Sequence, residues 1–493
     1  MTVPIESKGF NRYDKILILI FLLSLPLVNP WVRGDGVGYY AYARALVVNH
    51  NLQFEPDWRH ANPSFYMGRI DPSGRIRSDQ YTRTGHLDNH FTIGPALIWI
   101  PFLTIAHVAV LSADRLGARI PADGFSWPYV DMMAVVTAFV GFLGLFLSFR
   151  LARKYFPERW AFLATLGIWF ASSLLVYMYF NPSWSHAHSA FVVALFLWYW
   201  DRTRAARTFG QWVALGLIAG LMLDVYYPNA LFLLVLLVEL AITATRIFRS
   251  NAPKRMHELL SLFLRSSVLA AALAVAFLPT LVSRWVIYGS PFATGYTEVG
   301  VWHFTNAVWG KVLFSSDHGL FSWTPILLLA CAGLLFVARR NRVLGSALIL
   351  AAIAFYVLIA TYPDWDGISS YGNRFFISLT PIFVLGLTAL LAASEKIIRN
   401  RRVAWSGAIA VIALLTLWNF GLIFQWGMHL IPERGLISWS EVASNQFRVV
   451  PADLASSLQR YFTRRHQMMR GIEKKDLRQL GANNMKPNKN KQP

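Results

Sequence analysis

The sequence is poor in several features that soluble enzymes commonly use. It has a single cysteine, Cys331, inside an apolar run, so no disulfide can form within the chain and thiol chemistry is not expected. It contains no phosphate-binding Gly-rich loop, no paired CxxC motif and no GxSxG motif, so the signatures of P-loop proteins, CxxC sites and serine hydrolases are missing. Charged residues make up only 15% of the 493 residues, whereas hydrophobic residues make up 55% and occur in long runs. Such runs indicate a polytopic membrane protein.

Acidic residues are scarce as well. The chain has 26 Asp and Glu against 46 Lys and Arg, and a net charge of +20 would by itself suggest a nucleic-acid partner. Most of the basic residues, however, lie in short loops between apolar segments, and a second share lies in the C-terminal tail. We therefore expect no nucleic-acid partner.

The loops between apolar segments alternate in chemistry, and this alternation predicts the topology. One set is basic, and the other is aromatic, rich in Gly and Pro and nearly free of Lys or Arg, so the positive-inside rule places the first set in the cytoplasm and the second outside. Spans of roughly 20 apolar residues are predicted at residues 15 to 32, 129 to 150, 161 to 180, 187 to 201, 212 to 226, 229 to 245, 266 to 288, 323 to 338, 344 to 361, 375 to 393 and 403 to 425. These are about 11 transmembrane helices, with an uncleaved first span, the N-terminus inside and the C-terminus outside.

Residues 91 to 111 are also apolar enough to span, but a crossing there would put every later basic loop on the wrong face. We interpret them as a re-entrant or interfacial element, interrupted by Pro95 and Pro101, with both ends outside. Glu239, deep in an apolar run, is expected to pair with a polar partner inside the bundle.

The predicted fold is thus an all-α polytopic membrane protein with a transmembrane domain at residues 1 to 425. It contains a large first outer loop at 33 to 128, in which short helices such as "VGYYAYARALVVN" are expected to lie on the membrane surface. Residues 426 to 493 are predicted to form an outward-facing extension with an amphipathic helix, "PADLASSLQRYF", and a basic tail with a disordered end. The tail suits contact with anionic lipid headgroups, although a solvated basic end without a partner is an equal alternative.

An acid between two glycines follows the first span. Gly34, Asp35 and Gly36 alone would be an ordinary turn. Neighbours suited to a substrate site flank the acid: Arg33, Tyr39, Tyr40 and Tyr42. Flexible backbone beside an acid allows a substrate hydroxyl to approach closely, and a carboxylate is the usual group for removing its proton.

Four stretches, in this order along the chain, resemble the multi-spanning glycosyltransferases of the GT-C class: "GDGVGYY", "NHFTIGPALIWIPF", "SSDHGLFSWTPILLLA" and "YGNRFFISLTPIFVLGL". That class includes the protein O-mannosyltransferases of glycosyltransferase family 39 and the aminoarabinose transferases that modify lipid A. The resemblance covers roughly residues 10 to 425. It implies transfer of a hexosyl or pentosyl group from a polyprenyl-phosphate carrier to an acceptor hydroxyl of a lipid, glycan or protein at the outer membrane face.

The resemblance also implies that Asp35 is the catalytic base. An inverting single displacement needs one base on the acceptor and a stabilised phosphate leaving group, so one carboxylate suffices. The family often has a second acid in the loop after the third span, where this sequence reads "NPSWSHAHS", with His186 and His188 instead.

Arg374 is the only basic residue in its outer loop, and an isolated guanidinium there suits a carrier phosphate. The alternative is an interfacial anchor. Further candidates for substrate binding are His90, His186, His188, Asp224, Tyr227, Lys311, Asp317, His318, Asp364 and Asp366, for which turns, caps and interfacial placement are the plainer alternatives. Because these unusual polar residues gather on the predicted outer face, we expect one solvent-filled cavity.

Two histidines without a third ligand make a weak zinc signal, so we expect no metal cofactor, while a divalent cation stays open without a ligand pattern to support it. A transporter or flippase of lipid-linked sugars or polysaccharide is the main alternative, and a scaffold in envelope assembly is another. Transporters usually place ionisable residues near the bilayer midplane in two related halves, whereas this sequence concentrates them at one boundary. The resemblance implies a bacterial inner membrane, with the site facing the periplasm or cell exterior.

Overall fold

The computed structural model describes residues 10–250, 254–295 and 304–484, and their regular structure is helical apart from isolated bridges. Within these residues, seven helices are long and apolar enough to cross a membrane: Gly94–Arg115, Trp127–Tyr155, Tyr227–Arg249, Arg255–Ala276, Arg342–Ala360, Arg374–Ile398 and Arg401–Gly427. The prediction of an all-α polytopic membrane protein is confirmed.

The first half of the chain forms the following elements: α1 (Arg12–Ser24), η1 (Leu25–Leu27), α2 (Asp35–Arg44), η2 (Ala45–Asn49), α3 (Glu55–His60), α4 (Pro63–Tyr66), η3 (Ser78–Gln80), α5 (Gly94–Arg115), α6 (Trp127–Tyr155), α7 (Glu158–Phe170), α8 (Leu174–Tyr179), α9 (His186–Thr203), α10 (Phe209–Val225), η4 (Tyr227–Phe232) and α11 (Leu233–Arg249). The second half forms α12 (Arg255–Ala276), α13 (Leu278–Tyr288), α14 (Trp309–Phe314), α15 (Leu320–Trp323), α16 (Ile326–Arg340), α17 (Arg342–Ala360), η5 (Arg374–Leu379), α18 (Thr380–Ile398), α19 (Arg401–Gly427), α20 (Trp439–Thr463) and α21 (Arg465–Asn484).

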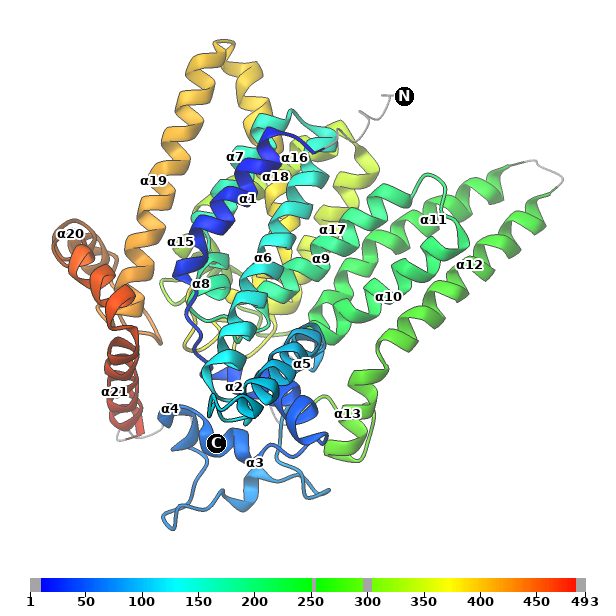
Figure 1. Ribbon diagram of the computed structural model, residues 1–493. Coiled ribbons are helices and arrows are strands. Elements are labelled where there is room, and N and C mark those ends of the chain that lie inside the picture. The colour runs from blue at the N-terminus through cyan, green and yellow to red at the C-terminus, as the bar shows by residue number, and fades with distance from the viewer. Residues whose placement is uncertain (1–9, 251–253, 296–303, 485–493) are drawn as a thin grey trace.

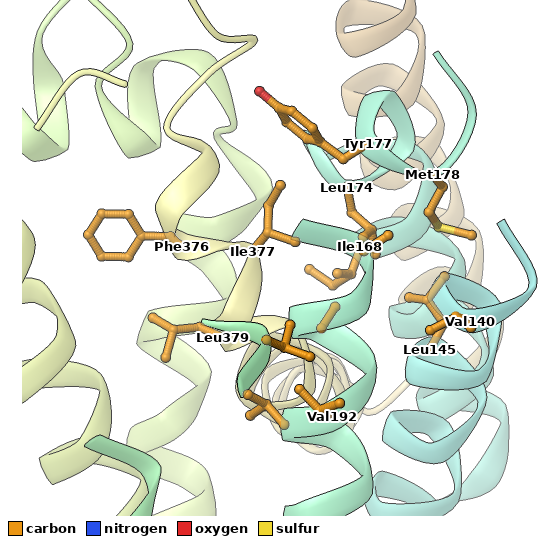
Figure 2. Packing of buried hydrophobic residues seen from close by; sticks show 14 of the residues in the cluster. Val140, Leu145, Ile168, Leu174, Tyr177, Met178, Val192, Phe376, Ile377 and Leu379 are labelled. Atoms are coloured by element: carbon orange, nitrogen blue, oxygen red, sulfur yellow. The ribbon is translucent and has the colours of Figure 1, made fainter. Parts of the chain in front are cut away.

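Helices α6, α7, α9, α16 and α18 pack against one another in the centre of the bundle (Figure 1). Helices α10, α11 and α12 extend to one side, and α19 stands on the other side and leads into α20 and α21 (Figure 1). Figure 2 shows how the core is filled where Val140 of α6, Ile168 of α7, Met178 of α8 and Ile377 of η5 approach one another. This packed core fixes the ends of α8, α9 and η5 that carry the site.

The loops predicted to be cytoplasmic meet at one end of the bundle through ion pairs. Asp14 of α1 lies 2.8 Å from Arg153 at the end of α6, and Arg153 lies 2.8 Å from Glu158 at the start of α7. Arg159 pairs with Glu395 at the end of α18. Loops distant in sequence therefore share one face, as the charge alternation predicts; that this face is cytoplasmic stays a prediction.

The expected partner of Glu239 is present. Its Oε1 accepts a hydrogen bond from Arg207 Nη1 at 2.8 Å, and its Oε2 accepts one from the Trp200 indole. A carboxylate in an apolar helix is stabilised in this way by a charged and a neutral donor, so this prediction is confirmed.

Several predicted spans differ from the observed helices. The candidate spans Trp127–Tyr155, Tyr227–Arg249, Arg342–Ala360, Arg374–Ile398 and Arg401–Gly427 match predicted ones. The prediction at 266 to 288 is wrong in its bounds, because α12 ends at Ala276 and a new helix, α13, begins at Leu278 with Pro279 in its first turn. The predictions at 15 to 32, 161 to 180, 187 to 201, 212 to 226 and 323 to 338 correspond to α1, α7 with α8, α9, α10 and α16, which are shorter or less apolar than the candidate spans. Asn419 of α19 explains the break between α7 and α8, because its amide donates to the carbonyls of Phe170 and Ser172 at 2.9 and 3.2 Å. A side chain from another helix thus satisfies carbonyls that the broken helix leaves free.

The first outer loop differs from the prediction in one respect. Its "VGYYAYARALVVN" segment is helical, as α2 and η2, but residues 36 to 44 are all buried and do not lie on a surface. The hydroxyl of Tyr40 donates to the Gly124 carbonyl and that of Tyr42 to the Asn89 carbonyl. Because both polar ends find partners inside the protein, the aromatic rings can be buried.

Helix α5 covers the segment interpreted as re-entrant or interfacial. It runs through Pro101 without a break, which argues against a re-entrant segment, and it is one of the seven helices long and apolar enough to cross a membrane. Its contacts with α6 pair Trp99 with Thr137 and His107 with Tyr129, all in the first part of α6. In Figure 1, α5 lies beside α2 at the end of the bundle opposite the ion-paired loops.

The C-terminal extension forms two consecutive helices, and the second, α21, docks against the first outer loop. Glu473 accepts a hydrogen bond from the backbone amide of Ser64 at 2.5 Å, and Asp476 lies 2.6 Å from Arg33. The predicted tail is therefore a packed helix as far as residue 484, and its two acids face the protein. The rest of the predicted disordered end, residues 485 to 493, lies outside the described residues.

Candidate active site

Asp35 is the first residue of α2, and the residue before it fixes its position. Gly34 has φ 53° and ψ −134°, a conformation that side chains other than glycine's rarely adopt. A Cβ at this position would lie 3.2 Å from the Trp184 ring, and the Trp184 indole donates to the Arg33 carbonyl at 3.0 Å. The chain thus enters α2 through a tight turn packed on Trp184, and the turn presents Asp35 at a helix N-terminus, where negative charge is favourable.

Asp35 forms an ion pair with Arg374, the first residue of η5. Arg374 Nη1 donates to Asp35 Oδ2 at 2.7 Å, and the guanidinium lies over the Trp184 ring at 4.4 Å from its centroid. The Asp35 side chain is 32% exposed and that of Arg374 11% exposed. The carboxylate is therefore accessible to a substrate, while the cation that holds it is almost enclosed.

Asp35 opens onto a cavity of about 610 Å³. Its wall is formed by residues of the first outer loop, the turn before α9 and the C-terminal extension: Arg33, Gly34, Asp35, Ser64, Phe65, Arg69, Phe91, Asn181, Trp184, Ser369, Trp426, His429, Leu430, Ile431, Pro432, Glu433, Arg434 and Asp476. A space of this size accommodates a sugar and its phosphate.

Arg69 is a cation on this cavity wall. Its guanidinium lies 3.7 Å from the centroid of the Phe65 ring and donates to the Phe65 carbonyl at 2.8 Å. Among the described residues no carboxylate forms an ion pair with it, and burial lowers the pKa of Arg69. A half-buried guanidinium without a carboxylate partner suits an anionic ligand.

A second polar group on the same wall joins the end of α19 to α21. His429 Nε2 lies 2.6 Å from Asp476 Oδ1 and 3.1 Å from Glu433 Oε1. Burial disfavours the charged imidazole, but the hydrogen bonds to Asp476 and Glu433 outweigh it and raise the pKa of His429 to about 9. Nothing in the sequence analysis singled out these residues.

The structure brings some of the predicted site residues together around Asp35. Arg33 lines the cavity and stacks on Trp31 at 4.4 Å. Tyr39 is buried one turn along α2, and burial and the charge of Asp35 raise its pKa, so it stays neutral. The His90 ring packs at a tilt against the Phe91 ring, with 4.2 Å between the ring centroids. Burial lowers the pKa of His90, although the charges of Asp88 and Asp35 oppose this shift.

Histidines of α9 lie behind the cavity and not in its wall. His186 packs edge-on against Tyr177 at 4.8 Å between ring centroids, and His188 packs in the same way against Trp99 at 4.8 Å. Both are buried. Neither histidine lines the cavity of Asp35, and neither is placed at an interface as the alternative expected, because both rings pack in the core.

Three other predicted residues, Asp224, Tyr40 and Tyr227, do not line the cavity of Asp35. Asp224, at the end of α10, is buried and accepts a hydrogen bond from Thr280 of α13. Tyr40 contacts a second cavity, of about 630 Å³, on the other side of α2. Tyr227 accepts a hydrogen bond from Arg284 Nε at 3.1 Å.

The remaining predicted residues do not line the cavity of Asp35. Lys311 is exposed on α14, and Asp317 Oδ1 lies 3.3 Å from Nδ1 of the buried His318, next to Trp323. Asp364 and Asp366 lie in the loop before η5, where burial and mutual repulsion raise the pKa of Asp364. Of the residues that we expected in one cavity, only Asp35 and Arg33 line the cavity of about 610 Å³. Most of the others lie in local turns or make contacts in the core.

Arg284 of α13 holds the first outer loop and was missed by the sequence analysis. Its Nη1 donates to the Asn89 carbonyl at 3.0 Å, and its Nη2 donates to the carbonyls of His90 and Phe91, each at 2.9 Å. Arg284 was hidden within a predicted span, and an arginine there is itself a signal of a specific partner.

Comparison with solved structures shows which fold these elements form. The chain is similar to the oligosaccharyltransferase of Archaeoglobus fulgidus, solved tethered to an acceptor peptide with the NVT sequon, with a TM-score of 0.52 and 17% identity. The fold is of the GT-C type. The match covers 85% of this chain and 55% of the oligosaccharyltransferase, so the chain spans about half the length of that protein.

The chain is also similar to ArnT of Cupriavidus metallidurans, solved bound to undecaprenyl phosphate, with a TM-score of 0.45 and 15% identity over 88% of this chain and 74% of that one. No protein-family model matches the sequence, and no curated protein matches it. The fold expected from the resemblance is thus confirmed by structure, while the activity has to be argued from the site.

Proposed function

We propose that the protein is a glycosyltransferase that moves a sugar from a polyprenyl-phosphate carrier to an acceptor hydroxyl, with Asp35 as the base. The observation that carries the proposal is the position of Asp35, which is accessible from a cavity of about 610 Å³ and held from behind by the buried Arg374. A carboxylate that is oriented by a cation and open on one side is equipped to remove a proton from a bound hydroxyl.

The reaction is a single displacement with inversion at the anomeric carbon. The acceptor oxygen attacks this carbon while its proton passes to Asp35, and the bond from the anomeric carbon to the phosphate oxygen breaks with its electron pair going to the phosphate. Arg374 holds the Asp35 carboxylate in position by donating a hydrogen bond to Oδ2, and Oδ1 makes no contact with Arg374 that would block a substrate hydroxyl. Arg374 Nη1 already donates to Asp35, so we propose that Arg374 orients the Asp35 carboxylate. We assign the contact with the donor phosphate to Arg69, which lines the cavity wall.

The location of the cavity suits a lipid-linked donor. Its lining residues come from the start of α2, the first outer loop and the C-terminal extension. Figure 1 shows α2 at the end of the bundle opposite the ion-paired basic loops. A carrier chain can stay in the membrane while its phosphate and sugar reach Asp35. By the positive-inside rule this end faces away from the cytoplasm, which in a bacterium is the periplasmic side of the inner membrane.

The proposal is tested by transfer of radiolabelled sugars from a panel of synthetic polyprenyl-phosphate sugars, with a membrane extract as acceptor. We expect wild type to use at least one donor, Asp35→Asn to use none, and Asp79→Asn to behave as wild type. Asp79 is the matched control because it is an exposed acid of the same outer loop, paired with Arg77 and lining neither cavity. Transfer by Asp35→Asn at the wild-type rate would remove Asp35 from the mechanism, and movement of labelled lipid across liposomes without transfer would favour the transporter.

A further inference from the structure

Three side chains of metal-ligating type converge where α21 meets the end of α19. His429 follows α19 directly, Glu433 lies in the next turn, and Asp476 comes from α21. One atom of each, an imidazole nitrogen and two carboxylate oxygens, lies within 4.8 Å of the others. The two acids are nearly buried, with 9% of Glu433 and 5% of Asp476 exposed.

Hydrogen bonds among His429, Glu433 and Asp476 cannot satisfy all three side chains at once. His429 Nε2 faces Asp476 Oδ1 and Glu433 Oε1 at once, but an imidazolium has only one hydrogen on that nitrogen. The two carboxylates therefore compete for a single donor, while a buried carboxylate needs strong compensation. Asp476 Oδ2 is already held by Arg33 Nη2 at 2.6 Å, so Arg33 fixes Asp476 in place without filling the shared centre.

We propose that His429, Glu433 and Asp476 form a binding site for a divalent cation of the zinc class, which fastens α21 to the end of α19. A dication accepts a lone pair from all three atoms at once, takes the place of the imidazole proton, and balances both carboxylate charges.

The ligand set favours zinc over harder cations. Mg²⁺ and Ca²⁺ prefer oxygen ligands, whereas an imidazole nitrogen with carboxylate oxygens suits Zn²⁺. Three protein ligands leave one position of a tetrahedral site, and all three residues also line the cavity of about 610 Å³, from which water can complete the shell. Arg33 is the outer partner that orients a ligating carboxylate.

The surroundings hold α21 where the site needs it. Lys475 Nζ donates to the Met428 carbonyl at 2.8 Å, and Glu473 accepts hydrogen bonds from Asn62 and from the Ser64 backbone. These contacts hold α21 in the position that brings Asp476 next to His429 and Glu433. It goes beyond the proposed function and does not depend on it, because cation binding is measured without any transfer reaction.

The test uses the full chain in detergent, stripped with EDTA and titrated with ZnCl2 in a calorimeter. We expect one equivalent to bind to wild type and the affinity to fall roughly 100-fold in His429→Gln and in Asp476→Asn. Glutamine keeps an amide donor for the carboxylates but is a poor zinc ligand. His466→Gln is the matched control, since His466 is an exposed histidine of α21, the helix that supplies Asp476, and this variant should bind zinc as wild type does.

Thermal unfolding and X-ray absorption give two further readouts. Zinc should raise the Tm of wild type and His466→Gln and leave that of His429→Gln unchanged. The absorption edge of zinc-loaded wild type should fit one imidazole with oxygen ligands, which decides the matter even if the variants fail to fold. No uptake by wild type, equal affinity in His429→Gln, a shell of several imidazoles, or equally tight Mg²⁺ binding would each overturn the proposal.

Discussion

Asp35 and Arg374 are 339 positions apart in the chain, yet Arg374 Nη1 lies 2.7 Å from Asp35 Oδ2, beside the cavity of about 610 Å³ that Asp35 lines. The acid comes from the start of α2 and the arginine from the segment that leads into α18. Trp184, just before α9, lies against both, since it packs under Gly34 and under the Arg374 guanidinium. Three distant segments therefore fix the orientation of one carboxylate.

Replacing Arg374 by glutamine should slow transfer strongly. The change removes the guanidinium that orients Asp35 through a hydrogen bond to Oδ2. A loss of about 100-fold in kcat corresponds to about 3 kcal/mol of transition-state stabilisation. Arg374→Lys keeps the charge but not the planar donor geometry, so its kcat should lie between those of wild type and Arg374→Gln. Steady-state kinetics decide the matter: an unchanged kcat in Arg374→Gln would show that the ion pair plays no part in the reaction.

Replacing Gly34 by alanine should disturb the entry to α2. At Gly34 the φ of 53° is unfavourable for alanine, and its Cβ would lie 3.2 Å from the Trp184 ring. We expect this strain to lower the free energy of unfolding by about 1–3 kcal/mol. We expect a lower Tm and reduced transfer. Gly68→Ala is the control, because a Cβ at Gly68 of the same outer loop meets no atom within 4 Å. Equal behaviour of the two variants would contradict the role assigned to the turn.

Replacing Arg69 by methionine should weaken donor binding more than it affects chemistry. The loss of one guanidinium contact to a phosphate should raise KM about 10-fold, or about 1.4 kcal/mol, with kcat nearly unchanged. Arg75→Met, in an exposed turn of the same loop, should leave both constants unchanged. A KM equal to that of wild type in Arg69→Met would move the phosphate site elsewhere.

Replacing Arg284 by methionine should destabilise the first outer loop. The carbonyls of His90 and Phe91 would lose the Arg284 donor, and that of Asn89 would keep the Tyr42 hydroxyl. Breaking a buried charged contact costs about 3–5 kcal/mol. We expect faster proteolysis within residues 60 to 90 and a lower Tm in detergent. Arg265→Met removes an exposed arginine of α12 and should change neither. Wild-type resistance of Arg284→Met to protease would refute the anchoring role.

The sequence predicted the parts of the site that carry a local signal. Asp35 was identified by its glycine neighbours and its place after an apolar run, and Arg374 by its isolation in an aromatic loop. Their ion pair could not be predicted, because it depends on how α2 and η5 pack across the bundle. For the same reason His186 and Asp224 were expected in the cavity, whereas the fold buries both side chains in the core.

The C-terminal extension shows a second limit of sequence reasoning. Glu473 and Asp476 occur among many basic residues, so the composition of the tail suggested a disordered or lipid-bound end. The structure turns both acids toward Asn62, Arg33 and His429, which belong to distant segments. The helix break at Ser172 was missed in a similar way, since hydropathy does not register an amide donor supplied by another helix.

The most direct test of the central claim separates binding from chemistry at Asp35. An excess of wild type or of Asp35→Asn would be mixed with a limiting amount of the productive radiolabelled donor in the presence of acceptor, and donor binding and single-turnover transfer would be measured on the same samples. If Asp35 is the base, the asparagine variant binds the donor with an affinity close to that of wild type and transfers at least about 1,000-fold more slowly, a range typical of losing an acid-base group. Transfer at a comparable rate by Asp35→Asn, with donor binding intact, would contradict the account.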